Sequence, residues 1–471
     1  MAASTTARRS LFRHRNYAKL WSAATVSLFG TQVSQIAIPF IAAVVLKASA
    51  GEVGLLTTIE FLPFILFTLP AGVWVDRFPK RRILVIGDLG RALMLVSIPV
   101  AHVLGVLTIW QLYVVGFVNG AMTVFFDVAD QSFLPTILER DELVEGNAKL
   151  QISQSSAQIL GQPVGGGLVA LLTAPLAVLI DAASYVGSAT LILWIRLTSS
   201  GARATGRRSD GPTSAAAAEG GTATSPSAGP SLAGEAEAAD RSPADEGGMR
   251  RQIMAGLRYI GTHRYLAAIA ASTATSNLFS NIAFAIMPVY LYRTLELSPA
   301  TVGAIGGAGG VGVLLGALIA SRTATTFGVG PVIVGSMFIG GLAGLLVPAA
   351  PPDLAFWFVG ASFFVVSFGS VIYNVNQVSL RQAITPEHFL GRMNATMRFL
   401  VWGTIPIGSL IGAGLSEIIG VHETIWVGSI LGVLAFLPVL LSPVRSLREI
   451  PGRIGRHRLP RAQSRWELGR D

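Results

Sequence analysis

Long apolar runs recur along this chain and constrain its fold more than any other feature. A helix needs about 20 predominantly apolar residues to cross the hydrocarbon core of a bilayer. Six such runs occupy residues 20–46, 52–75, 83–104, 109–134, 147–172 and 175–196. Six more occupy residues 265–292, 299–321, 329–350, 353–379, 390–418 and 423–443. The sequence therefore predicts an all-α membrane protein with twelve transmembrane helices.

Composition agrees with this prediction and excludes several other functions. Hydrophobic residues make up 51% of the chain and charged residues only 13%, too few to cover one soluble core. The chain has no cysteine, which excludes disulfides and thiolate metal sites. Its six histidines lack metal-ligand spacing, and no phosphate-binding loop sequence of the Gly-x4-Gly-Lys type occurs. We therefore expect no enzyme, no metal, no cofactor other than a proton gradient, and no nucleic-acid partner.

Lysine and arginine predict the orientation, because they are enriched in short cytoplasmic loops. The N-terminal arm, the connector between the halves and the C-terminal tail all lie on one side of the predicted spans and are basic. On the same side lie Lys80, Arg81, Arg82, Arg140, Arg322, Arg381 and Arg445. The other side has only Lys47 and Arg293. The sequence predicts a multi-pass protein of the cell membrane with both termini in the cytoplasm.

The chain divides into four parts. Residues 1–197 form an N-terminal six-helix bundle and residues 249–443 an interfacial helix followed by a C-terminal six-helix bundle. Between them, residues 198–248 are rich in Ala, Gly, Ser, Thr and Pro, a composition typical of a disordered cytoplasmic linker. Residues 444–471 form a basic tail suited to anionic lipid headgroups. Residues 249–263 are amphipathic, as in an interfacial helix, and a solvated helix cap is the alternative.

The two halves are related by an internal repeat. A shift of 247 residues lays the segment "NAKLQISQSSAQILGQPVGGGL" over "NATMRFLVWGTIPIGSLIGAGL", with Asn-Ala and three glycines in register. A shift of 249 residues lays Pro39 over Pro288, and the loop "SAGEVG" over "SPATVG". The sequence therefore predicts two pseudo-symmetric six-helix bundles. Transporters place their binding site between such repeats, near the membrane midplane.

One short motif identifies a family. The stretch "GVWVDRFPKR" contains Gly72, Asp76, Arg77, Lys80 and Arg81 and resembles the loop motif between helices 2 and 3 of the major facilitator superfamily. Pro79 stands where that motif has glycine. The phrases "EFLPFILFTLPAGVWVDR", "GDLGRAL" and "APLAVLIDAASYVGSA" resemble the macrolide-efflux and enterobactin-exporter branch. In the fifth span, "GQPVGG" is similar to the antiporter motif without its spacing, through Gly161, Pro163, Gly165 and Gly166.

The resemblance implies a gate at the cytoplasmic ends of the helices. Gly72 would let two helices approach closely, and Asp76 would complement the positive N-terminus of the eleventh span, near residues 392–396. Such a contact would hold one conformation and break in the other. The alternative is that the four cations of this stretch only enforce the topology; they are Arg77, Lys80, Arg81 and Arg82.

Ionisable residues inside the spans are candidates for proton coupling, because a charge at the centre of a membrane helix usually marks function or an ion pair. Glu60 lies near the middle of the second span without a nearby cation in sequence and is the first candidate. The alternative is a carboxyl group that bonds to backbone or faces a wet crevice. Asp88 and Arg91 can pair at i,i+3 and form a cluster with Asp127 and Asp130, either structural or protonation-sensitive.

A sixth candidate, Asp181, lies near the outer end of the sixth span. We expect it to anchor a turn or to accept hydrogen bonds from backbone donors there. Proton handling is the alternative role.

The family resemblance places the substrate cavity among spans 1, 4, 7 and 10. Their mid-span amide and aromatic residues are Gln32, Gln35, Asn119, Phe126, Asn277, Asn281, Tyr373, Asn374, Asn376 and Gln377. Gln32 falls on Asn281 under the shift of 249 residues, as expected for a site on a pseudo-two-fold axis. Each amide could equally join two helices. A cavity of amides and aromatic rings with few charges suits a neutral or largely apolar ligand.

These observations predict a monomeric secondary transporter that exports a small, largely apolar compound, such as an antibiotic or a siderophore-like metabolite, by alternating access coupled to protons. One alternative is an importer or lipid-related facilitator of the same fold. The other is a membrane sensor or scaffold that does not transport.

Overall fold

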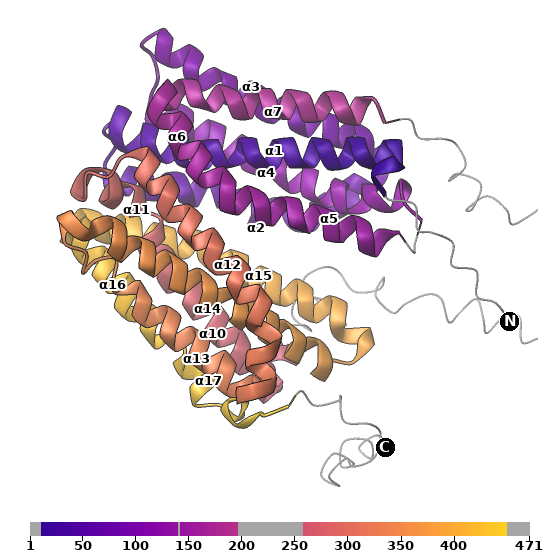
Figure 1. Cartoon of the computed structure of the whole chain (residues 1–471), viewed down its shortest axis with the longest axis vertical. Helices are drawn as coiled ribbons and strands as arrows, with labels where there is room; N and C mark the ends of the chain where they lie inside the picture. Colours follow the sequence, from indigo (N-terminus) through magenta and orange to yellow (C-terminus); the bar gives the residue numbers. More distant parts are fainter. Residues whose placement is uncertain (1–10, 140–141, 196–257, 450–471) are drawn as a thin grey trace, which may run out of the picture.

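The computed structural model describes residues 11–139, 142–195 and 258–449, and all regular structure in these ranges is helical. The expected linker, most of the expected interfacial helix, Arg140 and the tail beyond residue 449 lie outside the described residues. The described helices form two bundles, one from each half of the chain (Figure 1).

The first half forms what we call the N bundle. Its helices are α1 (Arg15–Phe40), α2 (Ala50–Arg77), α3 (Lys80–Val103), α4 (Ile109–Phe133), α5 (Leu143–Ser156), α6 (Gln162–Leu172) and α7 (Ala174–Leu193). A π-helical turn, η2 (Ile41–Val45), continues α1, and a second one, η4 (Ala157–Gly161), joins α5 to α6. The predicted fifth span is therefore one helix with a π-helical turn in its middle.

The second half forms the C bundle. Its helices are α10 (Arg264–Phe284), α11 (Met287–Val289), α12 (Pro299–Phe327), α13 (Val329–Gly344), α14 (Ala355–Ile384), α15 (Glu387–Ile419), α16 (Val421–Leu434) and α17 (Leu437–Leu440). A π-helical turn, η7 (Tyr290–Thr294), follows α11.

Nine helical stretches in the described residues are long and apolar enough to cross a membrane. The runs predicted at 147–172, 265–292 and 329–350 are not among them. The serines and amides of α5 and α10 lower their hydropathy, and the apolar helix α13 has only 16 residues. The all-α membrane class is confirmed, while the count of twelve spans stays a prediction.

Local backbone features repeat between the bundles at the offsets that the sequence predicts. The turn η7 begins and ends 249 residues after η2, and the left-handed residues Lys47 and Glu296, both at φ 52°, have the same offset. Ser49 caps α2, and Ser298 caps α12 in the same way. Positive φ is uncommon outside glycine, so its recurrence at matched positions is strong support for a duplicated unit.

The two bundles meet at one end only. We call the end from which the chain termini emerge the terminal side and the opposite end the closed side. In Figure 1 the bundles approach each other at the closed side and diverge toward the termini. One hydrophobic core contains buried side chains from both bundles, including Ile41 and Tyr290. Two further cores, around Phe133 and around Leu266, each belong to one bundle and lie toward the terminal side.

Small residues make the contact between the bundles possible. Helix α6 packs on α12, and α2 packs on α15. A Cβ atom on Gly303 of α12 would overlap the carbonyl oxygen of Gln162, and one on Gly166 of α6 would overlap that of Pro299. The glycines of α12 therefore act as a packing surface, since only residues without a side chain let these backbones come so close.

Candidate functional site

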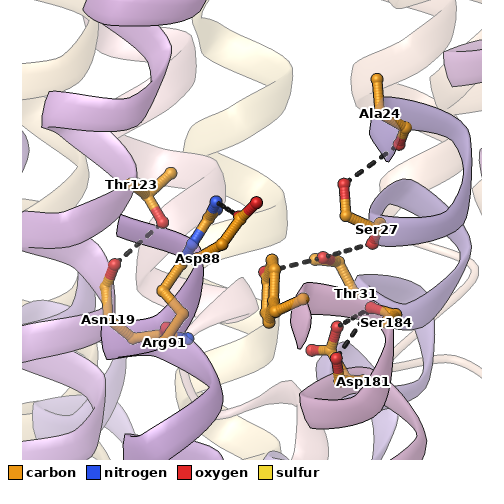
Figure 2. A network of polar contacts seen from close by, with 10 residues as sticks. Ala24, Ser27, Thr31, Asp88, Arg91, Asn119, Thr123, Asp181 and Ser184 are labelled. Atoms are coloured by element: carbon orange, nitrogen blue, oxygen red, sulfur yellow. Dashed lines mark hydrogen bonds and ion pairs between the residues drawn. The ribbon is translucent and has the colours of Figure 1, made fainter. Parts of the chain in front are cut away.

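A buried ion pair lies inside the N bundle. Asp88 and Arg91, both on α3, are 0% and 5% exposed, and a guanidinium nitrogen of Arg91 donates to Asp88 Oδ1 at 2.5 Å (Figure 2). The i,i+3 spacing places both side chains on one face of the helix. The pairing expected from sequence is confirmed.

Aromatic rings surround the guanidinium of Arg91. Its Cζ atom lies 4.3 Å from the centroid of Phe126 on α4 and 4.2 Å from that of Tyr185 on α7. The hydroxyl of Tyr185 is 2.9 Å from that of Thr31 on α1. A cation between two ring faces is stabilised by their quadrupoles. Arg91 therefore connects three neighbouring helices, and a hydroxyl contact extends the network to a fourth.

Three further acids belong to this cluster. Asp130 on α4 is close enough to Asp127, Asp88 and Arg91 to interact electrostatically with each of them. Asp181 on α7, only 1% exposed, accepts a hydrogen bond from Ser184 at 3.2 Å and also interacts with Arg91 (Figure 2). The predicted cluster is present; whether its members carry protons stays a prediction.

The expected role of Asp181 is corrected. Asp181 anchors no turn at the end of its span, because it lies in the middle of α7. Its side chain faces α1, where it lies beside Ser34 and packs on Gly30. Sequence reasoning missed this position because the contact is with a helix about 150 residues away.

Glu60 lies apart from the cluster, on the face of α2 that packs against α4. A Cβ atom on Gly116 of α4 would lie 2.8 Å from Glu60 Cγ, so the glycine leaves room for this side chain. Within the described residues, the carboxyl group of Glu60 makes no hydrogen bond and no ion pair. The backbone-bonded alternative therefore has no support in this conformation, and Glu60 remains the isolated acid that the sequence predicted.

The gating motif lies at the terminal side, where the bundles are apart. The side chains of Asp76 and Arg392 lie outside the described residues, so the expected contact between α2 and the start of α15 stays a prediction. Among the described atoms, none lies within 4 Å of a Cβ added to Gly72, and Trp74 and Phe78 are 58% and 61% exposed. The close approach expected at Gly72 is thus not present in this conformation.

Basic residues of the motif have partners that sequence reasoning missed. Arg81 donates to the carbonyl oxygens of Ile192 and Leu193, and Lys80 donates to that of Ser132 at 3.4 Å. These carbonyls belong to the last turns of α7 and α4, which carry the negative ends of the helix dipoles. Arg81 and Lys80 therefore cap helices of their own bundle, while Arg77 is exposed.

At the closed side, polar contacts join the bundles. Glu417, near the end of α15, accepts a hydrogen bond from the backbone N–H of Gly51 in the first turn of α2, at 2.7 Å. Arg293 in η7 donates to the carbonyl oxygen of Ala43 in η2, at 2.6 Å. The sequence predicts that the carboxylate of Asp76 on α2 meets the N-terminus of α15 at the terminal side. At the closed side the same two helices make the reverse contact, in which the carboxylate of Glu417 on α15 meets the N-terminus of α2.

Replacing Gly303 with Leu is expected to open the closed side, because the new side chain has no room against α6. With cysteines introduced at His102 and Glu423 for spin labels, double electron–electron resonance should show a longer distance between the two bundles than in the parent chain. Gly414→Leu on α15 is the matched control, since no atom of the described part of the chain lies within 4 Å of its added Cβ. An unchanged distance in Gly303→Leu would contradict the packing argument.

A cavity of about 560 Å³ lies mainly within the C bundle, among α10, α13, α14 and α16. Asn277, Asn281 and Tyr373, three of the predicted substrate residues, line it. Phe61 of α2 and Ile405 of α15 also contribute to its wall. Because α2 and α15 meet between the bundles, the cavity extends to the surface where the two halves join.

The other predicted substrate residues do not line this cavity. Asn376 donates to the carbonyl oxygens of Ile372 and Ala320, and so ties α14 to α12. Gln377 donates to Asn374, and Gln32 is buried against Gly161. Gln35 is exposed, Asn119 is half-buried on α4, and Phe126 packs on Arg91. The sequence could not predict these directions, because the rotation of a helix about its axis depends on its neighbours.

The antiporter-like motif is a packing element at two interfaces. Gly161 and Gly165 pack on Gln32 and Val33 of α1, whereas Gly166 and Pro163 pack on α12 of the other bundle. The motif thus lies where α1 and α12 both contact the fifth span. Its effect on the direction of transport stays a prediction.

Comparisons with known proteins agree with this architecture. The chain is 24% identical over 414 residues to the multidrug efflux pump Tap of Mycolicibacterium fortuitum, covering 84% of this chain and 89% of Tap. It is 21% identical over 434 residues to macrolide efflux protein A of Streptococcus pyogenes, covering 91% and 96%. It is also 27% identical to the uncharacterized MFS-type transporter YfiS of Bacillus subtilis, over 40% of this chain and 44% of YfiS.

A solved structure and a family model complete the comparison. The crystal structure of a bacterial homologue of the iron transporter ferroportin, in an inward-facing state, superposes with a TM-score of 0.67 at 15% identity, covering 92% of this chain and 99% of that one. The model described as Major Facilitator Superfamily matches residues 20–275 and 269–467. The resemblance read from the sequence is confirmed: the chain belongs to the major facilitator superfamily and is a multi-pass membrane transporter, not an enzyme.

Proposed function

We propose that this transporter exports small, largely apolar compounds in exchange for protons. The observation that carries the proposal is the buried cluster of Asp88, Arg91, Asp130 and Asp181 in the N bundle. Acids inside a membrane bundle are costly, and in membrane proteins they commonly mark proton relays or ion pathways. The isolated carboxyl group of Glu60 remains the first candidate for proton uptake, and the acids of the cluster are the alternative.

The arrangement of the bundles supports alternating access. They share a core at the closed side and have separate cores at the terminal side, as expected for one end state of a rocking transporter. We propose that the terminal side faces the cytoplasm, since the short basic loops lie there. The described conformation would then be open toward the inside of the cell.

The efflux direction is supported by two relatives of low identity, whose names describe them as a multidrug efflux pump and a macrolide efflux protein. Within the described residues, the wall of the cavity carries no charged side chain. Such a wall favours neutral compounds, because an unpaired charge is expensive to bury.

Inverted membrane vesicles, in which the proposed cytoplasmic side faces outward, provide the test. Nile red, an uncharged hydrophobic dye, serves as the reporter. An acidic interior should drive the dye into vesicles that contain the protein, and nigericin, which collapses the pH gradient, should abolish this accumulation. Accumulation only with an acidic exterior would indicate a proton-coupled importer. No movement with either gradient would favour the sensor or scaffold.

A further inference from the structure

The cavity of the C bundle occupies the position that the charge cluster occupies in the N bundle. Applying the repeat offsets of 249 residues for α3 and 247 residues for α4 and α7 moves five positions of the cluster and its surrounding rings onto the cavity wall. Asp127 and Asp130 are the exceptions, because they fall on Asn374 and Gln377, which do not line the cavity. The pairs are Asp88 with Met337, Arg91 with Gly340, Phe126 with Tyr373, Asp181 with Gly428 and Tyr185 with Gly432. One half of the repeat therefore fills this space with charged and aromatic side chains, and the other half leaves it open.

The exchange of large side chains for glycine explains why the cavity exists. Gly340 and Gly432 replace two large members of this set, an arginine and a tyrosine. Among the described residues, no atom lies within 4 Å of a Cβ atom added to either glycine, so neighbouring helices have not closed on these two positions. A volume of about 560 Å³ is within the range of small-molecule sites.

Polar groups on the cavity wall are available to a ligand. The side chains of Ser276, Asn277, Ser370 and Ser429 make no hydrogen bond to any other described residue. Phe61, Phe284 and Met337 supply apolar surface between them. Ser276, Asn277 and Ser429 are half-buried and Ser370 is exposed, so their hydroxyl and amide groups are accessible to a partner that both donates and accepts hydrogen bonds.

We propose that this cavity binds an uncharged ligand that carries hydroxyl, amide or carbonyl groups on an apolar body. The duplicated fold would then have divided its labour, with titratable groups in the N bundle and the ligand in the matching space of the C bundle. That this ligand is the transported substrate rests on the proposed function. The mouth of the cavity, beside Phe61 and Ile405, lies where movement of the bundles would open or close it.

Cysteine labelling tests whether the cavity prefers uncharged molecules. A single introduced cysteine can be followed because the chain itself has none. Ser370→Cys places a thiol on the cavity wall, and Gln382→Cys, exposed on the same helix, provides the reference rate for each reagent. Relative to this reference, neutral methyl methanethiosulfonate should react with the cavity thiol at least tenfold faster than the trimethylammonium or the sulfonate reagent. If a charged reagent reacts with the cavity thiol as fast as the neutral reagent, each rate taken relative to Gln382→Cys, the assignment to uncharged ligands is overturned.

Filling the cavity tests its location. In the Ser370→Cys background, Gly340→Leu and Gly432→Leu should each slow the neutral reagent at least tenfold. Gly335→Leu, on α13 but away from the cavity wall, has equally free space around its added Cβ and should leave the rate unchanged. An unchanged rate in both cavity variants would overturn the proposed site.

Protection from labelling tests binding itself. Chloramphenicol is uncharged and carries hydroxyl and amide groups on an aromatic body, and at millimolar concentration it should slow labelling of Ser370→Cys by at least threefold. The cation tetraphenylphosphonium should not. No protection by chloramphenicol, or equal protection by the cation, would overturn the ligand class. The measurement uses purified protein without a gradient, so it stands or falls independently of transport in vesicles.

Discussion

Replacing Arg91 with Met alone is expected to destabilise the protein by about 3–5 kcal/mol, because the substitution leaves the buried carboxylate of Asp88 without its partner. The loss of the contacts between the guanidinium and the rings of Phe126 and Tyr185 adds to this cost. Reversible unfolding in mixed micelles, followed by tryptophan fluorescence, measures the change in the free energy of unfolding.

A double variant separates the buried charge from lost packing. Asp88→Asn combined with Arg91→Met removes both charges, so it should recover a large part of the stability lost in Arg91→Met. Lys149→Met breaks the more exposed pair with Glu145, and it should cost less than about 1 kcal/mol. If Arg91→Met lowers the free energy of unfolding no more than Lys149→Met does, breaking the buried pair does not leave a costly unpaired charge in the N bundle.

Much of the fold could be predicted from the sequence because membrane helices are specified by local composition. A run such as 109–134 identifies its own helix, since the hydrocarbon imposes both length and apolarity. The repeat could be predicted equally well, because glycines, a proline and a loop sequence recur at fixed offsets. The glycines of α12 are also explained by local composition, since small residues in mid-membrane commonly serve helix packing.

The missing parts depend on which side chains meet across distant segments. The pairing of Asp88 with Arg91 is local and was predicted, whereas the contact of Arg91 with Tyr185 joins helices far apart in sequence. Asn376 was assigned to the substrate cavity for its residue type, yet its amide bonds to the neighbouring helix. The state of the gate could not be read either, because one sequence must support both end states.

One signal for the C-bundle cavity was present in the sequence. The same offsets that align the glycines also align Arg91 with Gly340 and Tyr185 with Gly432. The residues that the two repeats share indicate the common fold. The positions where one repeat has a large side chain and the other has glycine indicate the space in the C bundle. Divergence between duplicated halves is informative because the backbone frame is kept while the side-chain volume changes.

Glu60→Gln is expected to reduce accumulation of Nile red driven by the pH gradient at least tenfold, while keeping the protection of Ser370→Cys by chloramphenicol. Glutamine has nearly the same shape as glutamic acid and fits beside Gly116, but it cannot take up and release a proton. Binding depends on the C-bundle cavity, which Glu60 does not line, so it should survive the change.

The control for this variant is Glu145→Gln, which removes a carboxylate from the first turn of α5 outside the cluster and should retain full accumulation. Loss of both accumulation and protection in Glu60→Gln would indicate a structural role for the carboxyl group. Full accumulation would instead assign proton transfer to the cluster of Asp88, Asp130 and Asp181. In that case Asp130→Asn becomes the decisive variant, because Asp130 interacts with two other carboxylates, Asp127 and Asp88, and a proton bound to Asp130 would relieve this repulsion.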